Sequence, residues 1–225
     1  MRLPHGLKGI VFDFDGVLVD SEPLHHRALQ EVLQPHGVQI DFETFRRDYV
    51  GLDDETFFRR VWEMASLPEE QFNLRRLKAA KSKALELQIS HGVKSFPGVL
   101  DLVAELRELV PLAICSGSRR SEIVSLCSNL PRPTILDLFT CVVTRDDVPA
   151  SKPDPAGYRL AVERLGRHPA ECLAIEDTNT GIEAAHRANL RVMALATTHP
   201  IEKLKGADWY FGSLAGVDWP MLCPF

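Results

Sequence analysis

KGIVFDFDG, at residues 8–16, is a short apolar run that ends in charge and glycine. This pattern is typical of a buried strand in a parallel sheet, which delivers polar residues at its C-terminal end. Side chains alternate along a strand, so Asp13 and Asp15 should point the same way and share one small space. Two unpaired carboxylates there would repel each other, and one would tend to bind a proton. We therefore expect a positive group between Asp13 and Asp15.

Short apolar runs alternate with helical segments after the sequence SFPG at residues 95–98. Strands that alternate with helices of about ten residues indicate βαβ units and a parallel sheet. We predict an α/β fold with a Rossmann-like parallel sheet core. The predicted strands after the first are 112–115, 141–144, 172–177, 191–196 and a short last one at 209–211, and the predicted helices are 99–109, 121–127, 156–165 and 181–188.

Residues 21–91 contain no strand-like run and show helical periodicity instead. Asp41 and Asp53 are placed to cap the second and third predicted helices of this segment. Trp62, with its aromatic neighbours on the same helix face, is expected in the core of the segment. The segment therefore reads as an inserted all-α cap domain. The predicted domains are an α/β core at 1–18 and 94–225 and a helical cap at 19–93.

Composition limits the partners and surroundings of the protein. The 225 residues include 26 basic and 31 acidic ones, with no basic block for a phosphate backbone, so we expect no nucleic-acid partner. No apolar run reaches the length of a signal peptide or a membrane span, so we expect no membrane association. Five cysteines without a CxxC pair favour a reducing compartment, and we expect a cytoplasmic protein. We also expect a monomer, because a helical cap must move freely.

Polar residues follow the predicted strands, at the edge where open parallel sheets bind their ligands. Parallel strands end at the same edge, so four carboxylates, one lysine and two hydroxyls should converge there. The serine-glycine loop can offer hydroxyls and backbone N–H groups to an anion. The residues concerned are Asp13 and Asp15, then Ser116, Gly117 and Ser118, then Lys152, and finally Glu176 and Asp177.

This set of side chains indicates a magnesium-dependent phosphoryl site. Hard oxygen ligands without histidine or cysteine suit Mg²⁺, which also makes crowded carboxylates tolerable in their ionised form. A lysine, hydroxyls and N–H groups would hold phosphate oxygens, while one carboxylate acts as nucleophile and another as acid and base. Each motif alone also fits an ordinary turn, loop or helix cap. These explanations would have to hold at four strand ends at once, so a common functional site is the favoured explanation.

The sequence resembles the haloacid dehalogenase-like phosphohydrolase superfamily. The resemblance is to the subgroup with a helical cap after the first strand, which includes phosphoglycolate phosphatase, sugar phosphatases and β-phosphoglucomutase. Four motifs occur in the family's order, namely DFDGVLVDSEPLH, CSGS, SKPDP and IEDTNTG. Four motifs in order at predicted strand ends are more specific than any one alone. The resemblance covers nearly the whole chain, from Lys8 to Phe211.

The resemblance implies a role for each matching residue. Asp13 would be the nucleophile that forms an aspartyl phosphate, and Asp15 would be the general acid and base. Ser116 and Lys152 would bind the transferring phosphoryl group, and Lys152 would also restrain the charge of Asp13. The implied metal ligands are the Asp13 side chain, the Asp15 carbonyl, Asp177, and Glu176 either directly or through water.

Substrate contacts are expected from both predicted domains. In the core, Gly117 and Ser118 would contact the substrate, and Gly16 would let the chain leave the strand in a tight turn beside it. In the cap, β-phosphoglucomutase-like proteins carry a histidine where His25 falls. Lys81 is the cap lysine expected to reach the active site. The cap would close over the substrate and exclude water.

The predicted function is a Mg²⁺-dependent phosphatase for a small phosphorylated metabolite, of the sugar phosphate or phosphoglycolate type. Asp15 favours phosphoryl transfer over the dehalogenase chemistry of the same superfamily. Asp54 stands in VGLDDETF, where β-phosphoglucomutase places an arginine for the substrate's second phosphate, and an acid there would repel that phosphate. A sugar phosphomutase stays the alternative, since Arg46, Arg47 or Lys81 would supply the missing charge. A non-catalytic binding protein on the same scaffold is a more remote alternative.

Overall fold

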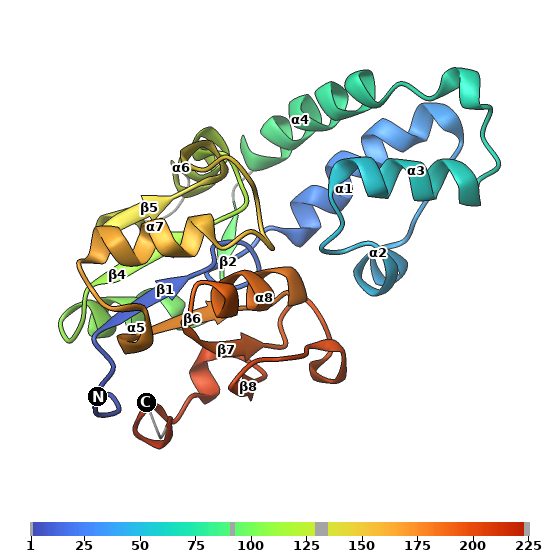
Figure 1. The fold of residues 1–225 in the computed structure, drawn as a ribbon. Helices are drawn as coiled ribbons and strands as arrows, with labels where there is room; N and C mark the ends of the chain where they lie inside the picture. The colour runs from blue at the N-terminus through green and yellow to red at the C-terminus, as the bar shows by residue number, and fades with distance from the viewer. Residues whose placement is uncertain (1, 91–92, 129–134, 223–225) are drawn as a thin grey trace. The chain divides into compact units, whose positions relative to one another are not determined.

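Six strands form one parallel sheet in the spatial order β5-β4-β1-β6-β7-β8 (Figure 1). The computed structural model describes residues 2–90, 93–128 and 135–222. The predicted α/β fold with a parallel sheet is confirmed. The strands are β1 Gly9–Phe12, β4 Leu112–Cys115, β5 Cys141–Val143, β6 Cys172–Glu176, β7 Arg191–Leu195 and β8 Trp209–Phe211.

Three of the predicted strands end one residue earlier than expected. The residues that follow β5 and β6 enter a cap or a turn, whereas Ala196, after β7, still donates its N–H to the carbonyl of Phe211 at 2.8 Å. Thr144, after β5, forms a capping box with Asp147 of the short helix η4, Arg145–Asp147. Asp177, after β6, begins the turn into the next helix. Thr144 and Asp177 are thus released from the sheet at its C-terminal edge.

The central strand β1 lies between β4 and β6, and the three strands end at one level. Phe12 is in register with Ile114 of β4 and with Ile175 of β6. The N–H of Asp13 donates to the carbonyl of Ile175 at 2.9 Å, so the ladder continues to the first carboxylate. The residues that follow these strands therefore emerge side by side.

Both faces of the central strands β1, β4 and β6 are buried, which is why these strands read as continuous apolar runs. Val11 and Ala113 belong to a core cluster with residues of α7 and α8, whereas Ile10 and Phe12 alternate to the opposite face and are also fully buried. In α7, a Cβ at Gly157 would lie 2.9 Å from the Cys115 sulfur, so the glycine allows close contact with β4. The helices of this part are α5 Val99–Arg107, α6 Arg120–Ser128, α7 Ala156–Leu165 and α8 Asn179–Arg187 (Figure 1).

Three helices differ from their predicted bounds. Helix α6 extends one residue further than predicted at each end, and α8 ends one residue earlier, at Arg187. Helix α8 begins two residues earlier than predicted, because the Thr178 hydroxyl accepts a hydrogen bond from the N–H of Gly181 at 3.2 Å and caps it. Helix α5 ends at Arg107, two residues before the predicted end at Leu109. Helix α7 has the predicted bounds.

The chain divides into two compact units, which are described separately. The sheet unit comprises Met1–Asp20 and Val93–Phe225, and the helical unit comprises Ser21–Gly92. The helical unit contains α1 Glu22–Leu33, η1 Gln34–His36, α2 Phe42–Asp48, α3 Asp54–Met64, η2 Glu69–Gln71 and α4 Leu74–Ser90.

The helical unit has the caps and the aromatic core that its sequence predicts. The Asp41 carboxylate accepts from the N–H of Thr44 at 2.9 Å at the start of α2, and Asp53 accepts from the N–H of Thr56 at 3.1 Å at the start of α3. Trp62 is only 3% exposed and lies in a cluster of buried aromatic and aliphatic side chains. The unit therefore has a hydrophobic core of its own.

A small antiparallel ladder in the sheet unit was not predicted. It pairs β2, Val19–Asp20, with β3, Lys94–Ser95, and places Asp20 opposite Lys94. Strands of two residues are too short to show an alternating pattern in the sequence. The ladder joins the segment that enters the helical unit to the segment that returns from it.

Four of the five cysteines lie in the described residues, and all four are free thiols. They are Cys115, Cys127, Cys141 and Cys172, whereas Cys223 lies outside the described residues. Among the helices of the described part of the chain, none combines the length and the hydropathy needed to cross a membrane.

Candidate active site

Three carboxylates gather at the C-terminal edge of the sheet. Asp13 directly follows β1, Glu176 is the last residue of β6, and Asp177 follows it. One oxygen from each of the three lies within 4.8 Å of the others, and all three residues are buried. The register of β1 and β6 produces this cluster, because it brings their ends to the same level.

Lys152 supplies the positive charge beside this cluster. Its Nζ donates to Asp13 Oδ1 and, at 2.6 Å, to Glu176 Oε1. The lysine side chain is 14% exposed and comes from the loop between η4 and α7. The positive group expected between Asp13 and Asp15 is a metal cation, and it stays a prediction. Lys152 is a second positive group, placed between Asp13 and Glu176.

Burial and neighbouring charges shift the pKa values of Asp13 and Lys152. Burial raises the pKa of Asp13 to about 8, with further upward contributions from Glu176 and Asp15 that Lys152 opposes. Burial would lower the pKa of Lys152, but Asp13 and Glu176 outweigh it and hold that pKa well above its ordinary value. Lys152 pairs with Asp13 and Glu176, and a divalent cation beside the three buried carboxylates would favour their ionised forms. The ligand atoms are all carboxylate oxygens, so the residues present fit Mg²⁺.

Asp15 faces the loop that follows β4. The Ser118 hydroxyl donates to Asp15 Oδ2 at 2.8 Å, and the Ser116 hydroxyl lies 3.5 Å from the same oxygen. The N–H of Ser118 donates to the Ser116 oxygen at 3.0 Å, which fixes the loop. The turn at Gly16, where φ is +76°, takes the chain away from the direction of β1. Asp15, Ser116 and Ser118 are thus brought together, as the strand-end argument expects.

Two glycines allow the carboxylates to approach the backbone. A Cβ at Gly16 would lie 1.8 Å from Asp177 Oδ2, and a Cβ at Gly181 would lie 2.0 Å from the Glu176 carboxylate. Gly16 was expected to allow a turn beside the substrate, and the structure adds that it makes room for Asp177. At Gly117, by contrast, a Cβ would meet nothing within 4 Å.

Sequence reasoning missed two residues that hold the site. The Tyr158 hydroxyl donates to Glu176 Oε1 at 2.5 Å, and the Thr197 hydroxyl donates to the Gly16 carbonyl at 2.5 Å. Thr197 follows β7, so the strand-end rule that selected the other residues would have selected it too. Tyr158 lies in the first turn of α7 and gives no such signal in the sequence.

The two remaining predicted residues, His25 and Lys81, belong to the helical unit and lie in α1 and α4. Lys81 Nζ forms an ion pair with Asp54 at the start of α3, and the two side chains are 15% and 31% exposed. The acid that stands in VGLDDETF is thus paired with Lys81, one of the three residues considered as a source of positive charge there. The same ion pair ties down the lysine that was expected to reach the active site.

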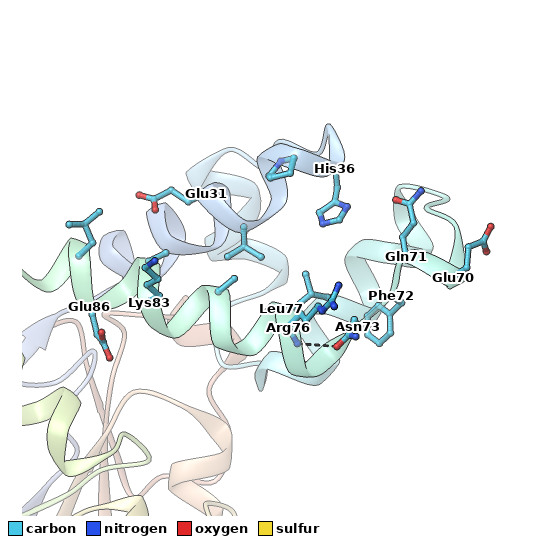
Figure 2. Close-up of a pocket in the computed structure, with 15 residues that line it drawn as sticks. Glu31, His36, Glu70, Gln71, Phe72, Asn73, Arg76, Leu77, Lys83 and Glu86 are labelled. Atoms are coloured by element: carbon cyan, nitrogen blue, oxygen red, sulfur yellow. Dashed lines mark hydrogen bonds between the residues drawn. The ribbon is translucent and has the colours of Figure 1, made fainter.

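A cavity of about 970 Å³ lies within the helical unit, and its lining includes none of the residues predicted for the site. Figure 2 shows His36 of η1 on one side and Arg76 and Leu77 of α4 on the other. Most of its lining is apolar, and the charged side chains around it are of both signs, with Glu31 and Lys83 among them. It lacks the cluster of carboxylates that marks the edge of the sheet.

Comparison with known proteins agrees with this geometry. Residues 7–189 match the model of the family described as "Hydrolase: haloacid dehalogenase-like hydrolase". That span contains every residue of the carboxylate cluster, together with Lys152 and the serine loop.

Curated relatives and solved structures match over almost the full chain. Validoxylamine A 7'-phosphate phosphatase of Streptomyces hygroscopicus subsp. limoneus is 30% identical over 96% of this chain and 99% of its own. Fructose-1-phosphate phosphatase YqaB of Escherichia coli is 29% identical over 81% of this chain and 93% of its own. CbbY from Rhodobacter sphaeroides in complex with phosphate is 28% identical with a TM-score of 0.76, and the match covers 94% of this chain and 99% of that chain.

Proposed function

The chain belongs to the haloacid dehalogenase-like hydrolases, and we propose that it is a Mg²⁺-dependent phosphatase of a small phosphorylated metabolite. The observation that carries the proposal is the buried cluster of Asp13, Glu176 and Asp177 with Lys152 against it. A substrate of the sugar phosphate type is favoured because one of the relatives is named a fructose-1-phosphate phosphatase.

Magnesium would bind at the carboxylate cluster. Asp13 and Asp177 would hold it through their side chains, Asp15 would add its backbone carbonyl, and Glu176 would contribute directly or through water. When bound, Mg²⁺ would neutralise charge on the phosphoryl oxygens. The protein's own cation, Lys152, would act on the same oxygens.

The protein residues divide the reaction between them. The Asp13 carboxylate would attack phosphorus and form an aspartyl phosphate, while Asp15 gives a proton to the leaving oxygen. Asp15 would then take a proton from the water that hydrolyses the aspartyl phosphate. Ser118 holds the Asp15 carboxylate at 2.8 Å and would aim it at the leaving group. Ser116 would bind a phosphoryl oxygen.

The test is phosphate release from a panel of phosphorylated metabolites, with Mg²⁺ and with EDTA. Asp13→Asn keeps the shape of the side chain and removes its charge, so turnover should fall to background while the far-UV circular dichroism spectrum is unchanged. Asp101→Asn, on the exposed surface of α5, is the matched control and should keep wild-type activity. Substantial Mg²⁺-dependent activity in Asp13→Asn would contradict the assignment of the nucleophile.

A sugar phosphomutase is the second candidate, and the Asp54–Lys81 ion pair favours keeping it. Because Lys81 neutralises Asp54, the charge of Asp54 no longer argues against a substrate with a second phosphate. The assay is β-glucose 1-phosphate with the 1,6-bisphosphate as primer. Isomerisation without phosphate release would place the mutase first, whereas release without isomerisation would support the phosphatase.

A further inference from the structure

Tyr158 is a fully buried polar side chain that the mechanism above does not use. It lies in the first turn of α7 with no exposed surface. Its hydroxyl donates to Glu176 Oε1 at 2.5 Å, and Lys152 Nζ lies 5.2 Å from the centre of its ring. The tyrosine therefore contacts both partners of the Lys152–Glu176 ion pair.

Glu176 is held by four donors, and Tyr158 is one of them. Oε1 accepts from Lys152 Nζ at 2.6 Å and from Tyr158, while Oε2 accepts from the N–H of Asp177 and the Thr178 hydroxyl, both at 3.2 Å. Two donors on each oxygen limit the rotation of the carboxylate. The space under the carboxylate is filled by the backbone at Gly181. Glu176 thus has one fixed orientation.

The orientation of Glu176 decides where Lys152 stands. Lys152 Nζ is held between Glu176 and Asp13, and its long side chain would sample several rotamers if one of these partners moved. A phenol is a neutral donor, so it fixes Glu176 without competing with the ammonium for charge. Removal of the phenol would leave Oε1 with Lys152 as its single described donor, and the pair would be free to rotate.

We propose that Tyr158 is a positioning residue that orients Glu176 and, through it, Lys152 against Asp13. It touches no reacting atom. The kinetic part of this proposal rests on the phosphatase function proposed above, but the geometric part does not. The expected consequence is that the hydroxyl supports the rate of phosphoryl transfer and the affinity for Mg²⁺ more than the affinity for substrate.

The test removes one oxygen atom, the Tyr158 hydroxyl. Tyr158→Phe keeps the ring beside Lys152, so the fold should persist, and Tyr210→Phe on the edge strand β8 is the matched control that also loses a hydrogen-bonded hydroxyl. In Tyr158→Phe, kcat should fall roughly tenfold to a hundredfold and half-saturating Mg²⁺ should rise about tenfold, with little change in KM. Tyr210→Phe should leave all three values at wild type. Equal behaviour of the two variants would overturn the proposal.

A double-mutant cycle shows whether Tyr158 acts through Glu176. In a Glu176→Gln background, the further change Tyr158→Phe should have almost no effect on kcat, because the group to be positioned is already altered. Full additivity of the two changes would overturn the proposal.

A readout without turnover separates this inference from the proposed function. The rise in melting temperature on adding Mg²⁺ should be smaller in Tyr158→Phe than in Tyr210→Phe, even if no phosphorylated substrate is hydrolysed. If the wild type hydrolyses nothing but this difference is seen, the phosphatase fails and the positioning role stands. If the Mg²⁺ shifts are equal, the positioning role fails whatever the activity.

Discussion

Replacement of Gly16 by alanine should abolish activity at a modest cost in stability. The residue has φ of +76°, where a side chain costs about 1–2 kcal/mol. The new Cβ would also lie 1.8 Å from Asp177 Oδ2, so the carboxylate would have to move by roughly 1.5 Å to reach ordinary van der Waals contact. Metal sites tolerate errors of about 0.2 Å, and a misplacement of about 1 Å costs on the order of a hundredfold in rate. We therefore expect a loss of at least about a hundredfold in kcat.

Gly98 provides a control with the same backbone strain. Its φ is +74°, and a Cβ there would meet nothing within 4 Å. Gly98→Ala should lower the free energy of unfolding by about the same 1–2 kcal/mol but keep its Mg²⁺-dependent phosphate release. The assay measures chemical unfolding, phosphate release and the Mg²⁺-induced rise in melting temperature for both variants. If Gly16→Ala keeps activity and the Mg²⁺ shift like Gly98→Ala, the argument that Gly16 makes room for a metal ligand is refuted.

Three further predictions concern pH and the helical core. Burial alone would raise the pKa of Asp147, but hydrogen bonds from Thr144 and ion pairs outweigh burial and lower this pKa to about 2. Its ionised form therefore adds stability above about pH 4 that is lost as pH falls through 2, and urea unfolding of Asp147→Asn should vary less with pH in this window. With the pKa of Asp13 raised to about 8, the metal-free protein should lose stability as pH rises from about 4 to 8, and the Mg²⁺-induced rise in melting temperature should be larger at pH 8 than at pH 6. Trp62→Ala should destabilise the helical unit by about 3–5 kcal/mol in denaturant titrations followed by circular dichroism, and a loss below 1 kcal/mol would contradict its place in the core.

The sequence was most informative about the residues that directly follow a single strand. The run that ends at Phe12, the serine loop after Cys115 and the acids at Glu176 were each placed by a local rule, namely that parallel strands deliver polar residues at their C-terminal ends. Helix caps at Asp41 and Asp53 follow from similarly local chemistry, and the structure contains both. Local patterns thus sufficed for the architecture and for most residues at the edge of the sheet.

Interactions between distant residues were not visible in the sequence. Nothing local indicates that Lys81 neutralises Asp54, since the two are 27 residues apart and meet only when α3 and α4 pack. The contact of Tyr158 with Glu176 depends in the same way on how α7 lies against the sheet. Distances set by tertiary packing were therefore beyond local reasoning, even where the residue types themselves were noticed.

The β2–β3 ladder brings the two ends of the inserted helical segment close together. Asp20 and Lys94 stand opposite each other across the antiparallel pair, where Cα atoms are about 4.5–5.5 Å apart. A two-residue hairpin turn is the natural connection between such positions. Everything from Ser21 to Val93 can therefore be replaced by a turn of that length without stretching any strand of the six-stranded sheet. The helical unit is a long insertion in the sequence of the sheet unit, but the two residues that flank it, Asp20 and Lys94, are only one strand spacing apart.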